Sequence, residues 1–323
     1  MKKALIIVSG VLLVGIGAFI GIRKICDTKA SNDIYKEAQD KYVLSVREDS
    51  ASEGENSGNG SGANDQNESE SGSGVNIWKD MLETVGIGGQ EDVAISEKTS
   101  GNSGDGSASS DGGSDADEFA AYSLDGTWQD KINVDLAALS AQYPDVKGWL
   151  YFENEDISYP IVQAYSDDKY MRMSYTGEKV SAGSIFMEAL NANDFTDAHT
   201  IIYGHNMKNH SMFGRLKNYL EQPKYYAGHQ YFQIIKLNPD GKIEKNRYKI
   251  FAYCKTNAAS KIYTVCREHD NYYADVINSI LLSSANNTGI PVSAENYVVT
   301  LSTCSNGDNR LTVSGVLVDV STQ

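Results

Sequence analysis

The chain has 323 residues and a formal net charge of −15. The charge is uneven, because residues 50–118 hold fifteen acidic and two basic residues and the rest of the chain carries only −2. The acidity therefore belongs to one segment, and the lack of a basic patch argues against a nucleic-acid partner.

The four cysteines are too few and too scattered for a disulfide framework, and no CxxC pair indicates a zinc site. We therefore expect neither a metal nor a cofactor. Cys254 and Cys266 lie in or beside short strand-like runs. Because a free cysteine packs as a small hydrophobic residue, both are expected to be buried or half-buried.

Residues 4–22 are almost uninterrupted in their apolar character. A helix of this length spans roughly 28 Å, the thickness of a bilayer core. We predict an uncleaved transmembrane signal anchor over residues 1–30. The alternative is a cleaved signal peptide, but its apolar region is usually shorter and no small-residue cleavage site precedes Arg23. Basic residues on both sides of the apolar run leave its orientation open.

A juxtamembrane helix is expected next, in residues 31–49. Ile34, Ala38 and Tyr42 follow one another at a four-residue spacing, which is typical of one face of a helix. This pattern predicts a short helix from Asn32 to Val43.

Residues 50–121 are rich in Ser, Gly and acidic residues, and such a composition cannot bury enough apolar surface to fold. We predict a disordered acidic tether with a root-mean-square reach of roughly 45 Å, which would hold the domain away from the lipid. Within the tether, residues 75–85 place Trp78 and other apolar residues on one helical face. A transient helix is expected there, and a docking or autoinhibitory segment is the alternative.

Residues 122–323 are predicted to form one catalytic domain. A helix is expected after Asn133 or Asp135, ending before Pro144, and further helices are expected over residues 211–220 and 270–284. Short β-rich runs predict eight strands, at residues 148–152, 157–163, 183–187, 200–203, 231–237, 248–254, 297–304 and 311–320. This pattern favours a mainly β fold, a closed or nearly closed barrel that leaves no exposed sheet edge.

Of the five histidines, His205 has the sequence context that is most consistent with a catalytic role. It ends the apolar run 199–205 and follows Gly204, which would leave space beside the imidazole. A strand-end histidine on its own is more often structural. The others lie in sequence contexts that we interpret as polar, and no role is expected for His199, His210, His229 and His269.

Cys304 ends the apolar run 297–304 and precedes a polar turn, so its thiol is expected at the exposed end of a rigid strand. Arg310 begins the next run, and a tight turn would return its guanidinium to Cys304, although an ordinary turn residue is the alternative. A thiolate nucleophile, an imidazole and a fixed donor for an oxyanion are the groups that acyl transfer requires.

Several segments resemble one enzyme family. Residues 300–304 (TLSTC) resemble the TLxTC signature of sortases, the cysteine transpeptidases that anchor proteins to Gram-positive cell walls. Residues 202–208 (IYGHNMK), continuing to 211–213, resemble the histidine motif of class B sortases. Further matches lie at residues 144–149, 159–163 and 183–187, and the resemblance covers residues 136–320.

The resemblance implies an eight-stranded sortase-type β-barrel with an N-terminal helix and a helix between strands six and seven. It implies that Cys304 is the nucleophile, that His205 is the general acid and base, and that Arg310 holds the substrate and stabilises the oxyanion. Three more residues match groove positions: Thr303, which helps to stabilise the oxyanion, Ser302 and Tyr203. Class B implies no metal.

The implied reaction cleaves a C-terminal sorting motif after Thr through a thioacyl enzyme and transfers the protein to a peptidoglycan amine. The implied partners are surface proteins with a sorting signal, a peptidoglycan precursor or stem-peptide amine, and the membrane, with the domain on its extracytoplasmic side. The alternatives are a pilin-polymerising sortase, a hydrolytic cysteine peptidase and a non-catalytic binding module. Glu188 stands where sortases usually have Asp, which bears on substrate preference.

Overall fold

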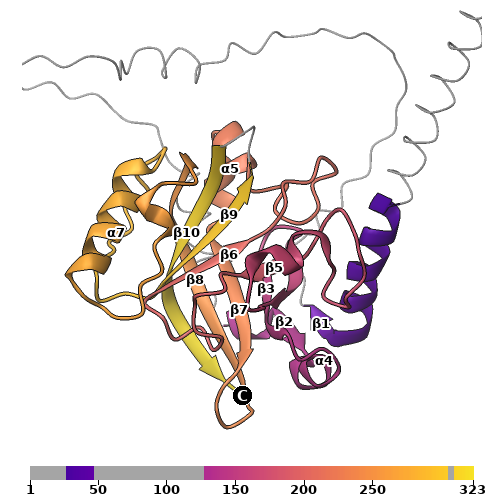
Figure 1. Ribbon diagram of the computed structural model, residues 1–323. Coiled ribbons are helices and arrows are strands. Elements are labelled where there is room, and N and C mark those ends of the chain that lie inside the picture. The colour runs from indigo at the N-terminus through magenta and orange to yellow at the C-terminus, as the bar shows by residue number, and fades with distance from the viewer. Residues whose placement is uncertain (1–26, 47–126, 305–308) are drawn as a thin grey trace, which may run out of the picture. The chain divides into compact units, whose positions relative to one another are not determined.

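The computed structural model describes residues 27–46, 127–304 and 309–323, and within these ranges eight strands close into a barrel (Figure 1). The strands are β3 (Val146–Phe152), β4 (Ser158–Val162), β5 (Ile185–Met187), β6 (His199–Tyr203), β7 (Tyr231–Leu237), β8 (Ile243–Asn257), β9 (Val298–Cys304) and β10 (Asn309–Thr322). Their order around the barrel is β10-β8-β7-β3-β4-β5-β6-β9. Neighbours are antiparallel except β4 with β5 and β6 with β9. The predicted mainly β, eight-stranded barrel is confirmed.

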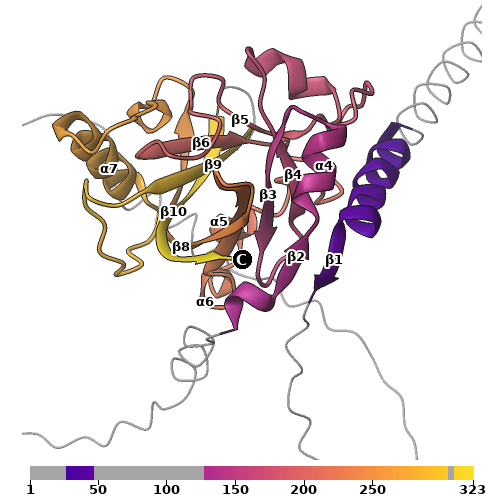
Figure 2. The same ribbon diagram turned by 90° about the horizontal axis from the view of Figure 1, so that it is seen from below.

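A helix over residues 27–42 and a two-stranded sheet pack outside the barrel. The sheet pairs β1 (Val43–Val46) with β2 (Ile132–Val134). In both views the helix lies on the opposite side of the barrel from α7 (Figure 1, Figure 2). Its residues Tyr35, Ala38 and Tyr42 are buried in the same core as the barrel interior. The helix that we had separated from the catalytic domain is therefore packed against it.

The pairing of β1 with β2 brings together the described residues on either side of the acidic segment. Val46 lies opposite Ile132 in the ladder. The helix before the segment contacts the barrel. The reach of the tether and the distance that it sets from the lipid stay predictions.

Several sequence predictions lie outside the described residues. They concern the apolar segment 4–22, the tether over residues 50–121 and the helical face around Trp78. Among the residues that the structure describes, no helix combines the length and the apolar character needed to cross a membrane.

Two predicted helices form as their caps indicate. In α4 (Leu136–Gln142), the Asp135 carboxylate accepts a hydrogen bond from the backbone N–H of Ala138 at 3.0 Å. Asp270 caps α7 (Asn271–Ser283) in the same way, and the helix lies between the sixth and seventh barrel strands. The shorter helices are η1 (Trp128–Asp130), η2 (Asp167–Arg172), η3 (Lys261–Tyr263), α5 (Asn218–Glu221) and α6 (Tyr225–Gly228).

The helix predicted over residues 211–220 is wrong. Only α5, at the end of that range, is helical, and the residues before it form turns. His210 and Met212 have φ angles of +64° and +54°, in the left-handed region that an α-helix cannot contain. Met212 instead forms an isolated bridge with Asn206, which folds this segment back on itself.

His199 does not lie in a polar environment as we expected, because its side chain is fully buried at the start of β6. Its Nδ1 donates to the carbonyl oxygen of Thr264 at 2.8 Å. A carbonyl can only accept, so Nε2 accepts from the hydroxyl of Thr300, also at 2.8 Å. Burial lowers the pKa of His199 from 6.5 to about 4. The neutral imidazole thus joins β6 to β9.

The pKa of His199 predicts a loss of stability in acid. Between pH 6.5 and about 4 the unfolded chain binds a proton that the folded chain does not, so this contribution to stability is complete above pH 6.5 and falls with pH. We expect denaturant unfolding to show that wild type loses about 2 kcal/mol more than His199→Gln between pH 7 and pH 5. His210→Gln, which changes an exposed imidazole, should behave as wild type. Equal losses in wild type and His199→Gln would contradict the prediction.

Candidate active site

The ends of three strands place the candidate residues together. β6 runs parallel to β9 with Tyr203 opposite Ser302, and the backbone N–H of Gly204 donates to the carbonyl of Ser302 at 3.1 Å. Cys304, of which the backbone is described, is the last residue of β9, and Arg310 of β10 is its cross-strand partner. One end of the barrel therefore holds His205, Cys304 and Arg310.

His205 is held through both its backbone and its ring. Its carbonyl accepts a hydrogen bond from the N–H of Phe213 at 3.0 Å, and its Nε2 lies 2.6 Å from the carbonyl oxygen of Met171. Since that oxygen can only accept, Nε2 carries the hydrogen and Nδ1 is the ring atom that can exchange a proton. A Cβ on Gly204 would lie 2.5 Å from Ile185 and 2.7 Å from Phe213, so glycine permits this packing.

A pocket of about 260 Å³ opens at this edge of the barrel. Five predicted site residues line it: Tyr203, His205, Ser302, Thr303 and Arg310. The remaining lining residues are Asp167, Asp168, Met171, Phe186 and Gly204. The structure thus brings these five predicted residues around one cavity, beside the backbone of Cys304.

Hydrogen bonds fix the aromatic wall of the pocket. Tyr203 donates its hydroxyl to Glu188 Oε2 at 2.8 Å and stacks on Tyr263, with ring centroids 6.4 Å apart. The Tyr263 hydroxyl in turn lies 2.8 Å from Ser302 Oγ. Burial, followed by the charge of Glu188, raises the pKa of Tyr203, so its hydroxyl stays protonated as a donor.

Thr303 differs from its neighbours in having an unsatisfied hydroxyl. Its side chain is 2% exposed, and its Oγ1 has no hydrogen-bond partner among the described residues. Buried polar atoms are nearly always paired in folded proteins, so a buried hydroxyl without a described partner is an exception, here in a residue that lines the pocket. Arg310 is half-buried beside it, and its Nη1 donates to the carbonyl of Asn309 at 3.2 Å.

Two contributors to the pocket were missed by sequence reasoning. Asp167 accepts a hydrogen bond from the N–H of Ala189 at 2.8 Å, while burial and then the nearby Glu188 raise its pKa to about 6. Its only signal in the sequence was a pair of acidic residues in a polar turn. Met171 contributes a main-chain carbonyl, which no side-chain pattern reveals.

Two other cysteines lie within the described residues, and neither lines this pocket. Cys254 and Cys266 are free and buried, as predicted. Burial raises the pKa of both thiols, that of Cys266 to about 11, so neither forms a thiolate readily at neutral pH. Among the described residues, no group of three or more His, Cys, Asp or Glu side chains could hold a metal ion.

Comparison with known proteins identifies the family to which the chain belongs. No family model matches the chain. Over 205 residues, however, it is 31% identical to sortase B of Listeria monocytogenes, an alignment that covers 62% of this chain and 79% of that protein. The chain belongs to the sortase family, class B. Sortase B of Staphylococcus aureus is 27% identical over 190 residues, which cover 59% of this chain and 75% of that protein.

Solved sortases agree with this assignment. A crystal structure of sortase B from Bacillus anthracis is 32% identical and superposes with a TM-score of 0.51 over 56% of this chain and 83% of its own. Sortase B from Clostridium perfringens, at 27% identity and the same TM-score, is covered over its full length, with 57% of this chain matched. Sortases are cysteine transpeptidases, and this chain is therefore an enzyme of that kind.

The raised pKa of Asp167 can be used to test whether the carboxyl groups of Asp167 and Glu188 are coupled in the pocket. Replacing Glu188 with Gln removes the neighbouring carboxyl, so the pKa of Asp167 should fall from about 6 toward its ordinary value of 3.8. Titration of the carboxyl carbons by NMR measures the change. Glu178→Gln is the control, because Glu178 is exposed and contacts Thr176 instead. An Asp167 pKa that is the same in wild type and Glu188→Gln would refute the coupling.

Proposed function

We propose that this sortase cleaves a C-terminal sorting motif after Thr and transfers the protein to an amine of cell-wall peptidoglycan. One observation carries the proposal: His205, Arg310 and Thr303 line one pocket at the strand end where Cys304 lies. These are the residue types that acyl transfer through a thioester requires.

In the first half-reaction, the Cys304 thiolate attacks the carbonyl carbon of the motif's Thr and forms a C–S bond. The C–N bond of the peptide then breaks, and His205 donates the proton that the leaving amine requires. The products are a thioacyl enzyme and a C-terminal fragment with a free amine.

Negative charge develops on the carbonyl oxygen while this bond exchange takes place. The guanidinium of Arg310 is a fixed positive charge in the pocket wall, and the Thr303 hydroxyl is a buried donor without a described partner. Donors that are already in place stabilise an oxyanion without reorganisation, so we assign both residues to this role.

In the second half-reaction, a peptidoglycan amine attacks the thioester carbon. His205 accepts the proton from that amine, the C–S bond breaks and the thiolate of Cys304 is regenerated. The hydrogen bond from Nε2 to Met171 supports this role, because it keeps one ring hydrogen in place while Nδ1 gains and loses the other.

The partners follow from the reaction. The donors are surface proteins with a C-terminal sorting signal, and the acceptor is a peptidoglycan precursor or stem-peptide amine. We propose that residues 1–30 anchor the chain in the cell membrane as a single pass, with the domain extracytoplasmic. The apolar run of residues 4–22 supports this anchor. Nothing in the sequence favours nucleic acid.

The proposal is tested with the full-length chain, a panel of sorting peptides, and triglycine or a stem peptide as the amine. We expect wild type to yield the peptide joined to the amine, identified by mass spectrometry. Cys304→Ala should lower the cleavage rate by at least about a thousandfold. Cys266→Ala is the matched control and should remain active, because that thiol is buried and has a raised pKa.

Each other outcome has a distinct meaning. Cleavage that Cys304→Ala leaves unchanged would remove the cysteine mechanism. A wild-type product that is only hydrolysed, with amine present, would make the protein a cysteine peptidase. Transfer to a lysine of a second surface protein, in preference to the stem-peptide amine, would instead identify a pilin-polymerising sortase.

A further inference from the structure

The helix over residues 27–42 contacts both segments that hold His205. The first segment, residues 170–184, contains Met171, whose carbonyl oxygen is bonded to His205 Nε2. The second is the turn segment that runs from His205 to Phe213. Tyr35, which is 4% exposed, lies where the helix meets the barrel and reaches both.

Tyr35 holds the first segment through Gly183. Its hydroxyl donates to the carbonyl oxygen of Gly183 and lies 3.2 Å from Ser184 Oγ. Gly183 has a φ of +57°, and a Cβ built on it would lie 2.6 Å from the carbonyl oxygen of Met171. Gly183 is thus packed directly against the oxygen that binds His205. A continuous series of contacts leads from the Tyr35 hydroxyl to the imidazole.

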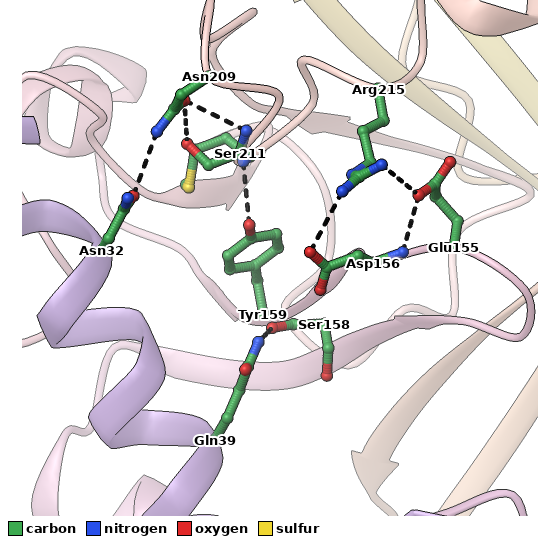
Figure 3. A network of polar contacts seen from close by, with 10 residues as sticks. Asn32, Gln39, Glu155, Asp156, Ser158, Tyr159, Asn209, Ser211 and Arg215 are labelled. Atoms are coloured by element: carbon green, nitrogen blue, oxygen red, sulfur yellow. Dashed lines mark hydrogen bonds and ion pairs between the residues drawn. The ribbon is translucent and has the colours of Figure 1, made fainter. Parts of the chain in front are cut away.

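Tyr35 holds the second segment through Tyr159. The two rings pack edge to face, with centroids 5.4 Å apart and an interplanar angle of 85°. The Tyr159 hydroxyl points at the turn and accepts a hydrogen bond from the N–H of Met212 at 3.0 Å (Figure 3). The next N–H, that of Phe213, donates to the carbonyl of His205. The backbone of His205 is therefore two hydrogen bonds away from a ring that Tyr35 supports.

A cavity of about 370 Å³ lies between the helix and this turn, with Asn32 and Gln39 on the helix side and Asn209 on the turn side. Asn209 donates to Asn32 Oδ1 at 3.4 Å in an exposed bond, and Gln39 bonds to the carbonyl of Ser158 (Figure 3). The pair formed by Tyr35 and Tyr159 is, by contrast, buried.

We propose that Tyr35 is a positioning residue for His205, acting through the Met171 carbonyl on one side and the Tyr159 hydroxyl on the other. Tyr35 does not line the active-site pocket, so it acts on the imidazole and not on the substrate. The inference rests on the proposed proton-transfer role of His205. It also gives the N-terminal helix a part in the reaction, in addition to its part in the fold.

The test compares two tyrosines of the same helix in the full-length chain. Tyr35→Phe keeps the ring and removes the hydroxyl, and we expect kcat to fall by about ten- to a hundredfold with KM little changed, because imidazole geometry is lost while peptide binding is not. Tyr42→Phe is the matched control. Its hydroxyl donates to Gln142 Oε1 at 2.7 Å, so its removal leaves the bonds to Gly183 and Met212 in place, and kcat should not change.

A second measurement reads His205 directly. The ¹⁵N shifts of its ring should show a hydrogen on Nε2 in wild type and in Tyr42→Phe, and a shift toward a mixture of tautomers in Tyr35→Phe. Tyr159→Phe and Gly183→Ala perturb the two sides separately and should each move the same signals. Thermal unfolding of every variant sets a temperature at which all are folded.

The outcomes separate this inference from the proposed function. Equal kcat values for Tyr35→Phe and Tyr42→Phe would overturn the positioning role, as would a fall in kcat with unchanged His205 shifts. Loss of cleavage in Cys304→Ala establishes the cysteine mechanism, whatever the Tyr35→Phe variant shows. If Cys304→Ala remains active, the proposed function fails, while the ring shifts of His205 still decide whether Tyr35 positions the imidazole.

Discussion

The parallel pairing of β6 with β9 is the constraint on which the candidate active site depends. It lets two strands about a hundred residues apart in sequence end at the same edge of the barrel, and β10 then returns Arg310 opposite Cys304. Under the segment between β8 and β9, the buried imidazole of His199 bonds to Thr300 and so joins the same two strands. A single register thus sets the relative positions of the residues proposed as acid, nucleophile and oxyanion donor.

The strands of the barrel could be predicted from the sequence, because apolar runs mark where each strand begins and ends. All eight barrel strands were expected from such runs, and the run that ends in a thiol was expected to end at the barrel edge. Proximity of His205 to Cys304 could not be derived from spacing, since nothing local determines which strands are neighbours. It came from a resemblance of short motifs to a family whose topology is known.

The parts that could not be predicted share a physical cause: they depend on tertiary burial or on the main chain. The low pKa of His199 and the high pKa of Asp167 arise from surroundings that distant segments supply. The carbonyl of Met171 has no side-chain signature. The residue pattern of 211–220 favoured a helix, yet the left-handed conformations of His210 and Met212 turn that segment back toward the site. Likewise, helical periodicity indicated an apolar face around Tyr42 but not which surface would cover it.

The antiparallel contact between β1 and β2 makes the acidic segment an insertion within a folded unit, because its ends are anchored at opposite residues of one ladder. Closing a loop between two paired strands costs only about 0.6 kcal/mol more for each doubling of its length. Changes in the length of this stretch are therefore expected to leave the barrel and its helix in place.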